Sequence, residues 1–263
     1  MVLSDWIGLA WIVGAICFCF ASVGIGIIIA EVIGREHAVL WIVGLQCAFQ
    51  ILISFTSAQF VGLTIGGVTF ITIAGSLIYP TIELGANYLN EFYGLKISRT
   101  SVNAQLVCRV VTSVVLGFLF LLPTAVGYEK NHDAFLNLNK IVPRIAAASI
   151  IATWITGLVM VYVYDAIRAR TGERMLWLRA VSANVVSMFV NSVLFVILAF
   201  SFVLPIHILL NMVAVQILFK FIDSFLELGF LYGLREMKAR GLLVRNAAKL
   251  TVPAAATSHG VSI

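Results

Sequence analysis

Long runs of apolar residues recur along this sequence, and each run is about as long as a membrane-spanning helix. A helix needs about 20 apolar residues to cross the hydrocarbon layer of a bilayer. Apolar residues make up 61% of the 263-residue chain and charged residues only 11%, whereas soluble domains are about half apolar and about a quarter charged. We therefore predict an all-α fold, a polytopic membrane helical bundle of about seven transmembrane helices. The predicted helices cover residues 7–30, 38–60, 66–90, 103–126, 143–167, 181–203 and 207–234.

The basic residues predict the orientation of these helices, because cytoplasmic loops carry the excess of Lys and Arg. With the N-terminus outside, thirteen of the seventeen basic residues lie on the cytoplasmic side and three on the outer side, while Lys220 lies within the last helix. We therefore predict a multi-pass protein of the inner (plasma) membrane with a cytoplasmic C-terminus. The thirteen are Arg35, Lys96, Arg99, Arg109, Arg168, Arg170, Arg174, Arg179, Arg235, Lys238, Arg240, Arg245 and Lys249, and the three are Lys130, Lys140 and Arg144.

The chain divides into a transmembrane domain, residues 1–234, and a basic cytoplasmic tail, residues 235–263. The tail ends in TVPAAATSHGVSI, which has too few large apolar residues to bury a core. A net charge of +5 would favour nucleic-acid binding in a soluble protein. Here the basic residues cluster at the ends of apolar runs, so we predict the lipid bilayer as the surroundings and no nucleic-acid partner.

Motifs for catalysis, nucleotide binding and metal binding are missing from the sequence, which has no GxxxxGK, HExxH or GxSxG string. The four cysteines lie inside apolar runs without CxxC spacing, and no histidine has a companion at metal-ligand spacing. We therefore predict no catalytic residue, no metal and no cofactor.

The third predicted helix carries a row of polar side chains at membrane depth. Glu83, Asn87 and Glu91 follow one another at intervals of four residues, which places them on one face of a helix, and Tyr79 comes one turn earlier. Pro80 removes a backbone hydrogen bond and can free a carbonyl group for a ligand. Because polar groups are costly in lipid, this face predicts one wall of a binding site. An alternative places Glu91 at the inner membrane interface.

Three other predicted helices carry polar residues that we assign to the same site. Asparagines of the sixth helix can bind a ligand or hold helices together, and Lys220 of the seventh can face a ligand or be neutralised by its neighbouring carboxylates. Gln59, near the outer end of the second helix, fits a ligand contact or a water-exposed position equally well. We expect Glu83, Asn87, Asn184, Asn191, Lys220 and Asp223 to converge on one cavity near the middle of the membrane. The predicted substrate-binding residues are Tyr79, Glu83, Asn87, Glu91, Asn184, Asn191, Lys220, Asp223, Glu227 and Gln59.

Residues 79–99 have the sequence YPTIELGANYLNEFYGLKISR. In this segment Pro80 is followed by Asn87, Glu91, Tyr93 and Gly94. This pattern resembles the signature of the queuosine precursor transporter family, also called the vitamin uptake transporter family. Three later segments resemble further helices of that family in the same order. They are PRIAAASIIATWITG at 143–157, SANVVSMFVNSVLFVILAF at 182–200 and FKFIDSFLELGFLYG at 219–233.

The resemblance covers about residues 56–234 and implies a six-helix family core, to which the first helix is an addition. It also implies import of a 7-deazaguanine base. Asn87 and Asn191 stand where the family typically has aspartate, whereas Glu83, Asp223 and Glu227 stand where it usually has apolar residues. The acidic residues are therefore relocated in this chain, and we expect binding to depend on Glu83 or Asp223 more than on Asn87.

We predict a transporter that imports a small purine-like heterocycle, most closely a queuosine or 7-deazaguanine precursor, and no enzymatic activity. One alternative is a substrate-binding membrane subunit of an energy-coupling vitamin importer, which would dock on a separate ATPase module. A less favoured alternative is an integral-membrane lipid-modifying enzyme, which would require clustered histidines or paired acids at an interface. Co-purification with ATPase subunits would distinguish the first alternative from a transporter that works without them. A homodimer is compatible with the transporter and with both alternatives.

Overall fold

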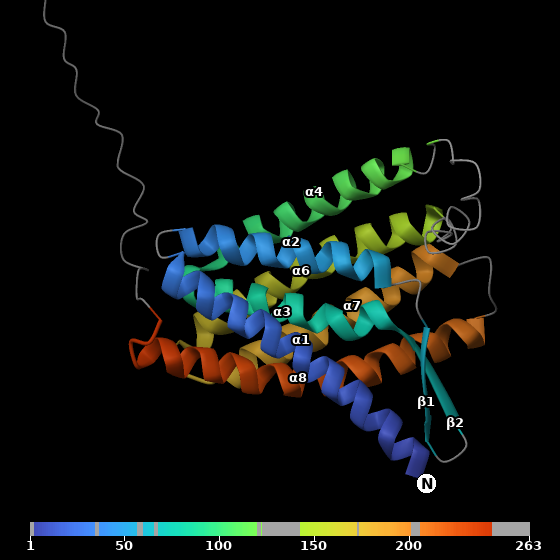
Figure 1. Cartoon of the computed structure of the whole chain (residues 1–263). Helices are drawn as coiled ribbons and strands as arrows, with labels where there is room; N and C mark the ends of the chain where they lie inside the picture. The colour runs from blue at the N-terminus through green and yellow to red at the C-terminus, as the bar shows by residue number, and fades with distance from the viewer. Residues whose placement is uncertain are drawn as a thin grey trace, which may run out of the picture.

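The computed structural model shows a bundle of long helices with a small β-hairpin at one end (Figure 1). It describes residues 3–34, 37–56, 60–65, 68–119, 122, 143–172, 174–200 and 206–243. The elements are α1 (Leu3–Ile33), α2 (Ala38–Thr56), β1 (Phe60–Ile65), β2 (Val68–Ile73), α3 (Ala74–Tyr93), α4 (Leu95–Leu119), α6 (Pro143–Thr171), α7 (Leu176–Phe200) and α8 (Ile206–Ala239).

The prediction of an all-α polytopic bundle is confirmed. Within the described ranges, α1, α2, α4, α6 and α7 are long and apolar enough to cross a membrane. Large apolar side chains such as Trp11 and Phe18 are exposed on the outside of the bundle, where lipid would cover them. The apolar core is formed by residues such as Phe20, Val161 and Leu231, which pack α1, α6 and α8 together.

Helix α3 lies inside this bundle and is the element that carries most of the buried polar groups. It contacts α1, α2, α4, α6 and α8, and every residue from Thr81 to Glu91 is buried. A helix enclosed on all sides by other helices does not need an apolar surface toward lipid, and it can present polar side chains to its neighbours. The fold therefore places the predicted polar row at the centre of the protein.

The start of the third predicted helix is wrong, because a β-hairpin occupies residues that were assigned to it. Strands β1 and β2 pair antiparallel from Phe60 opposite Ile73 to Ile65 opposite Val68, and α3 begins only at Ala74. The strands are rich in Val, Ile, Thr and Phe, and the two residues between them in the sequence are both glycine. This is the composition of a two-residue hairpin. An apolar run of this length does not by itself distinguish a strand from a helix.

The fourth predicted helix also begins at the wrong residue, since α4 starts at Leu95 and not at 103. Gly94 adopts a positive φ of 84° between α3 and α4, a conformation that glycine tolerates and other residues rarely adopt. The first turns of α4 are polar, but Ser98 and Ser101 are buried, and the Ser98 hydroxyl donates to the carbonyl oxygen of Ala86 over 3.0 Å. Hydropathy alone misses such a helix because its polar side chains face other helices.

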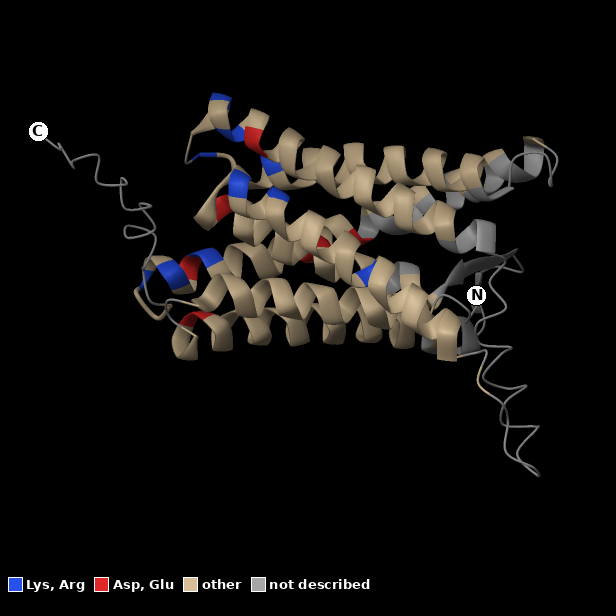
Figure 2. Cartoon of the chain, turned by 90° about the horizontal axis from the view of Figure 1, so that it is seen from above, with Lys and Arg blue, Asp and Glu red and all other residues tan. Residues whose placement is uncertain are grey.

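Lys and Arg residues gather at one end of the bundle, opposite the end where the N-terminus lies (Figure 2). This end combines the start of α4, the end of α6, the start of α7 and the end of α8. Arg109 is an exception: the charge count placed it on the cytoplasmic side, whereas it is buried within α4. Helix α8 continues to Ala239, past the predicted domain boundary at 234. Most of the predicted tail lies outside the described residues, and that division stays a prediction.

Candidate functional site

The polar row of α3 is buried as the sequence predicted. Tyr79, Glu83, Asn87 and Glu91 all have buried side chains, and Pro80 lies within the helix one turn before Glu83. The four residues do not share one environment, however. They divide between a cavity, a network of amides and carboxylates, and an ion pair near the basic end of the bundle.

The amide network joins three helices through Asn87 of α3, Asn184 of α7 and Glu227 of α8. The Asn87 amide donates to Asn184 Oδ1 over 3.0 Å and to Glu227 Oε1 over 2.8 Å, and the Asn184 amide donates to Glu227 Oε2. Asn87 Oδ1 is buried and has no hydrogen-bond partner in the described part of the chain. The Glu227 carboxylate is thus held by two amides, each of which the sequence had assigned to the site.

Two further carboxylates adjoin this network. The Ser187 hydroxyl donates to Glu83 Oε1 over 3.3 Å, and this contact connects α7 to the polar face of α3. Asp223 is buried one turn before Glu227 on α8, and the two carboxylates are within electrostatic reach of each other. Three acidic side chains therefore lie close together in the interior of the bundle.

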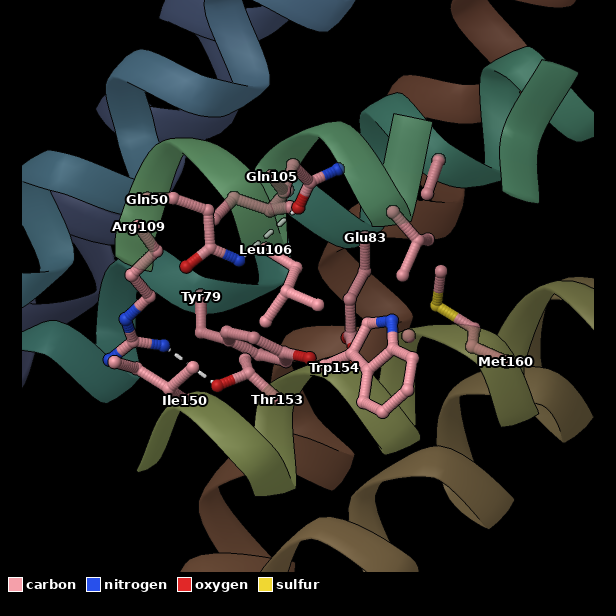
Figure 3. Close-up of a pocket in the computed structure, with 14 residues that line it drawn as sticks. Gln50, Tyr79, Glu83, Gln105, Leu106, Arg109, Ile150, Thr153, Trp154 and Met160 are labelled. Carbon is pink, nitrogen blue, oxygen red and sulfur yellow. Dashed lines mark hydrogen bonds between the residues drawn. The ribbon is translucent and has the colours of Figure 1, made fainter. Parts of the chain in front are cut away.

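A small cavity opens between α2, α3, α4 and α6, and Glu83 lies on its wall (Figure 3). The cavity has a volume of about 30 Å³, which is enough for about one or two water molecules. Sites for small organic ligands typically enclose about 300 Å³ or more, so a ligand of that size requires the surrounding helices to separate. The lining residues are Gln50, Tyr79, Ile82, Glu83, Ala86, Val102, Gln105, Leu106, Arg109, Ile150, Thr153, Trp154, Gly157 and Met160.

Arg109 is the basic side chain of this cavity, and the sequence analysis did not assign it to the site. Its guanidinium donates to Thr153 Oγ1 and to Ser149 Oγ of α6, each over 2.7 Å. Its partners in the described ranges are neutral hydroxyls, and no ion pair to Arg109 is formed there. The available signal was its position inside an apolar run, since an arginine at membrane depth usually marks a functional site.

A chain of carboxamides forms another part of the wall. The Gln50 amide donates to Gln105 Oε1 over 3.2 Å, and the Gln105 amide donates to Ser101 Oγ over 3.1 Å. Ser101 in turn donates to Gln46 Oε1. The other end of this chain is open, because Gln50 Oε1 is buried without a hydrogen-bond partner among the described residues. Figure 3 shows this oxygen on the side of the cavity where Arg109 and Tyr79 lie.

Glu91 lies outside the cavity, in a network near the basic end of the bundle. Arg179 forms a buried ion pair with Glu91 Oε1, and the Tyr164 hydroxyl donates to Glu91 Oε2 over 2.8 Å. Arg179 also donates to the carbonyl oxygens of Gly172 and Arg174. Glu91 therefore lies apart from the cavity, and its position at the inner interface stays a prediction.

The structure does not place the remaining predicted substrate-binding residues at the cavity. Asn191 is only half-buried and does not line the cavity. Lys220 belongs to α8, but its side chain is not among those described, and Gln59 lies outside the described residues altogether. Of the six residues expected to converge on one cavity, Glu83 lines it, whereas Asn87, Asn184 and Asp223 adjoin it through the amide network and its neighbouring carboxylates. Their contact with substrate stays a prediction.

Helices of membrane length that enclose carboxylates, amides and an arginine define a multi-pass membrane protein with polar groups buried in its interior. The family model described as "Putative vitamin uptake transporter" matches residues 73–234, and the chain belongs to this family. The chain is also similar to the "Probable queuosine precursor transporter" of Bacillus subtilis (strain 168), with 29% identity over 165 residues, or 62% of this chain and 71% of the relative. No solved structure matches the chain.

Membership of this family makes the chain a membrane transporter and not an enzyme. The matched residues include α3, α4, α6, α7 and α8 as far as residue 234, while α1, α2, β1 and all of β2 except Ile73 precede the match. Helix α2 nevertheless contributes Gln50 to the cavity. The site therefore combines the matched part of the chain with a segment that lies before it.

Proposed function

We propose that this transporter imports a purine-like base, and specifically a 7-deazaguanine precursor of queuosine, across the plasma membrane. The observation that carries the proposal is Glu83, a buried carboxylate on the wall of a cavity that also contains Tyr79 and Trp154. The name of the Bacillus subtilis relative supports the same class of substrate. We further propose that the basic end of the bundle faces the cytoplasm, as the excess of Lys and Arg indicates.

The chemistry of a guanine-like base suits these residues. Its amino group and ring N–H are donors, and a buried carboxylate accepts such donors in charge-assisted hydrogen bonds that are about twice as strong as neutral ones. The flat faces of the ring can stack on aromatic side chains such as Trp154. A planar base with several donors on one edge thus satisfies both the acidic and the aromatic parts of the wall.

The cavity in this structure is too small for such a base, so binding must accompany a movement of the helices. Transporters of this kind expose a central site alternately to each side of the membrane by moving one part of the bundle against another. The cavity between α2, α3, α4 and α6 is, in this proposal, the closed form of that central site.

The test is binding of 7-deazaguanine bases to the purified protein, together with uptake by cells that express it. The variant Glu83→Gln keeps the shape of the side chain and removes its charge. We expect it to bind the base about tenfold or more weakly, as for loss of a hydrogen bond to a charged group. Glu236→Gln is the matched control, because Glu236 is exposed near the end of α8. Equal binding by the wild-type protein and Glu83→Gln would remove Glu83 from the site.

A further inference from the structure

We propose that Arg109 is a substrate-binding residue, which donates hydrogen bonds to a carbonyl oxygen of the base while Glu83 accepts from its N–H groups. This inference rests on the proposed function and adds a specificity-determining residue to it. The cavity would then have two poles, an acidic one at Glu83 and a basic one at Arg109. Both residues line the cavity, and Tyr79 lies within electrostatic reach of each of them.

The depth of Arg109 in the bundle is the first argument. It lies fourteen residues after Leu95, the first residue of α4, which is about 20 Å along the helix axis at about 1.5 Å per residue. Its side chain is only 7% exposed. A guanidinium at this depth is costly in a bilayer, and such residues usually face a cavity or a pathway.

The partners of Arg109 are the second argument. The other buried cations with described ion pairs have carboxylate partners, since Arg179 pairs with Glu91 and Lys238 with Glu31. Arg109 instead donates to the hydroxyls of Ser149 and Thr153. A guanidinium has five N–H donors, and these two hydrogen bonds leave donors of Arg109 for a further acceptor.

The third argument is independent of Arg109 and concerns Gln50. Its Oε1 atom is buried on the cavity wall without a partner in the described ranges, although its amide is fixed by Gln105. Buried polar atoms without a partner are rare and call for an explanation. An acceptor beside a cationic donor is the arrangement that a lactam group requires, because a lactam places an N–H next to a carbonyl oxygen.

The experiment compares two probes, 7-deazaguanine and 2-amino-7-deazapurine, which lacks the 6-carbonyl oxygen and, with it, the neighbouring ring N–H. We expect wild-type protein to prefer 7-deazaguanine by about 10- to 100-fold, as for hydrogen bonds to a charged donor. In Arg109→Gln the affinity for 7-deazaguanine should fall by a similar factor, while the affinity for 2-amino-7-deazapurine changes little. The preference should therefore shrink by that factor in this variant, leaving the part that is due to the ring N–H, and Arg109→Lys should restore part of the loss.

Arg99→Gln is the matched control, because Arg99 is exposed on the same helix and bonds to Tyr162 over 3.1 Å. It should keep the wild-type preference. If Arg109→Gln does not fold, Gln50→Leu and Arg109→Lys provide the same comparison of the two probes. An unchanged preference in these variants, or an equal loss of affinity for both probes, overturns the inference and leaves the proposed function standing. Wild-type protein that binds neither probe overturns both.

Discussion

Two arginines are buried in the described part of the chain, Arg109 and Arg179, and their surroundings differ. Arg179 is fully buried and is surrounded by a carboxylate, a tyrosine hydroxyl and two backbone carbonyl oxygens. Arg109 is almost as deeply buried, but its partners are two hydroxyls on α6. A buried charge with a complete set of partners holds helices together. A buried charge with neutral partners and a neighbouring cavity has donors left for a further acceptor, and in our proposal this difference separates a structural ion pair from a substrate site.

The largest expected effect follows from removing the charge of Arg179. Arg179→Gln leaves the Glu91 carboxylate buried without its cation, and breaking a buried pair in this way costs about 3–5 kcal/mol. We expect a large fall in the thermal unfolding temperature of the purified protein, or failure to accumulate in the membrane. Arg240→Gln is the control, because its partner Glu236 is exposed and such surface pairs contribute little. If Arg179→Gln unfolds like the wild type, the ion pair is not the structural element described here.

The second prediction concerns Lys238, Glu31 and the tyrosines around them at the same end of the bundle. Lys238 Nζ donates to Glu31 Oε1 over 2.7 Å, and Tyr88 and Tyr93 donate to the same oxygen. Glu31→Gln removes the charge that these three donors share, so we expect a loss of about 1.5–3 kcal/mol in the free energy of unfolding. Tyr93→Phe removes a single donor and should cost less. A smaller effect for Glu31→Gln than for Tyr93→Phe would contradict this account.

The third prediction compares two asparagines of α7. Asn184 is buried and donates to Glu227, whereas Asn191 is half-buried. Asn184→Leu should lower the free energy of unfolding by about 1–3 kcal/mol, because it leaves a buried carboxylate with one donor fewer. Asn191→Leu should change it by less than about 0.5 kcal/mol. Thermal unfolding of both variants in the same detergent makes the comparison, and equal effects would place the two asparagines in equivalent roles.

The fourth prediction is that Arg109→Gln lowers the stability of the protein only slightly. The change removes a costly buried charge and leaves hydroxyls behind, one of which, Thr153, already donates to the carbonyl oxygen of Ser149. We expect the unfolding temperature to shift far less than in Arg179→Gln, even though both variants lose an arginine. Similar losses of stability in the two variants would show that Arg109, like Arg179, has a structural role.

The last prediction involves no change of stability and tests which side of the membrane the basic end faces. Arg170 is exposed near the end of α6. In the variant Arg170→Cys, the thiol should be protected from a membrane-impermeant reagent in intact cells. It should react after the membrane is opened. A cysteine at His132, in the loop predicted to lie outside, should react in both conditions. Labelling of position 170 in intact cells would reverse the proposed orientation.

The membrane-spanning bundle and the polar row of α3 could be predicted because each depends on spacing within a single helix. Apolar runs of sufficient length require a bilayer or a large core, and the interval between Glu83 and Asn87 places both on one face whatever surrounds the helix. The hairpin was missed because its apolar residues suit either a strand or a helix. The first turns of α4 were missed because Ser98 and Ser101 are polar but face other helices.

The partners of the buried charges were decided only by the tertiary structure. The interval between Glu91 and Arg179 is 88 residues, and no local rule connects two positions so far apart. The packing of α6 against both α3 and α7 brings Arg179 to Glu91, whereas the packing of α4 against α6 brings hydroxyls to Arg109. The sequence alone determined that charged and amide side chains would be buried within the membrane. Whether each one stabilises the bundle or faces the cavity depends on which helices lie beside it, because a buried charge takes its role from the groups within hydrogen-bonding distance.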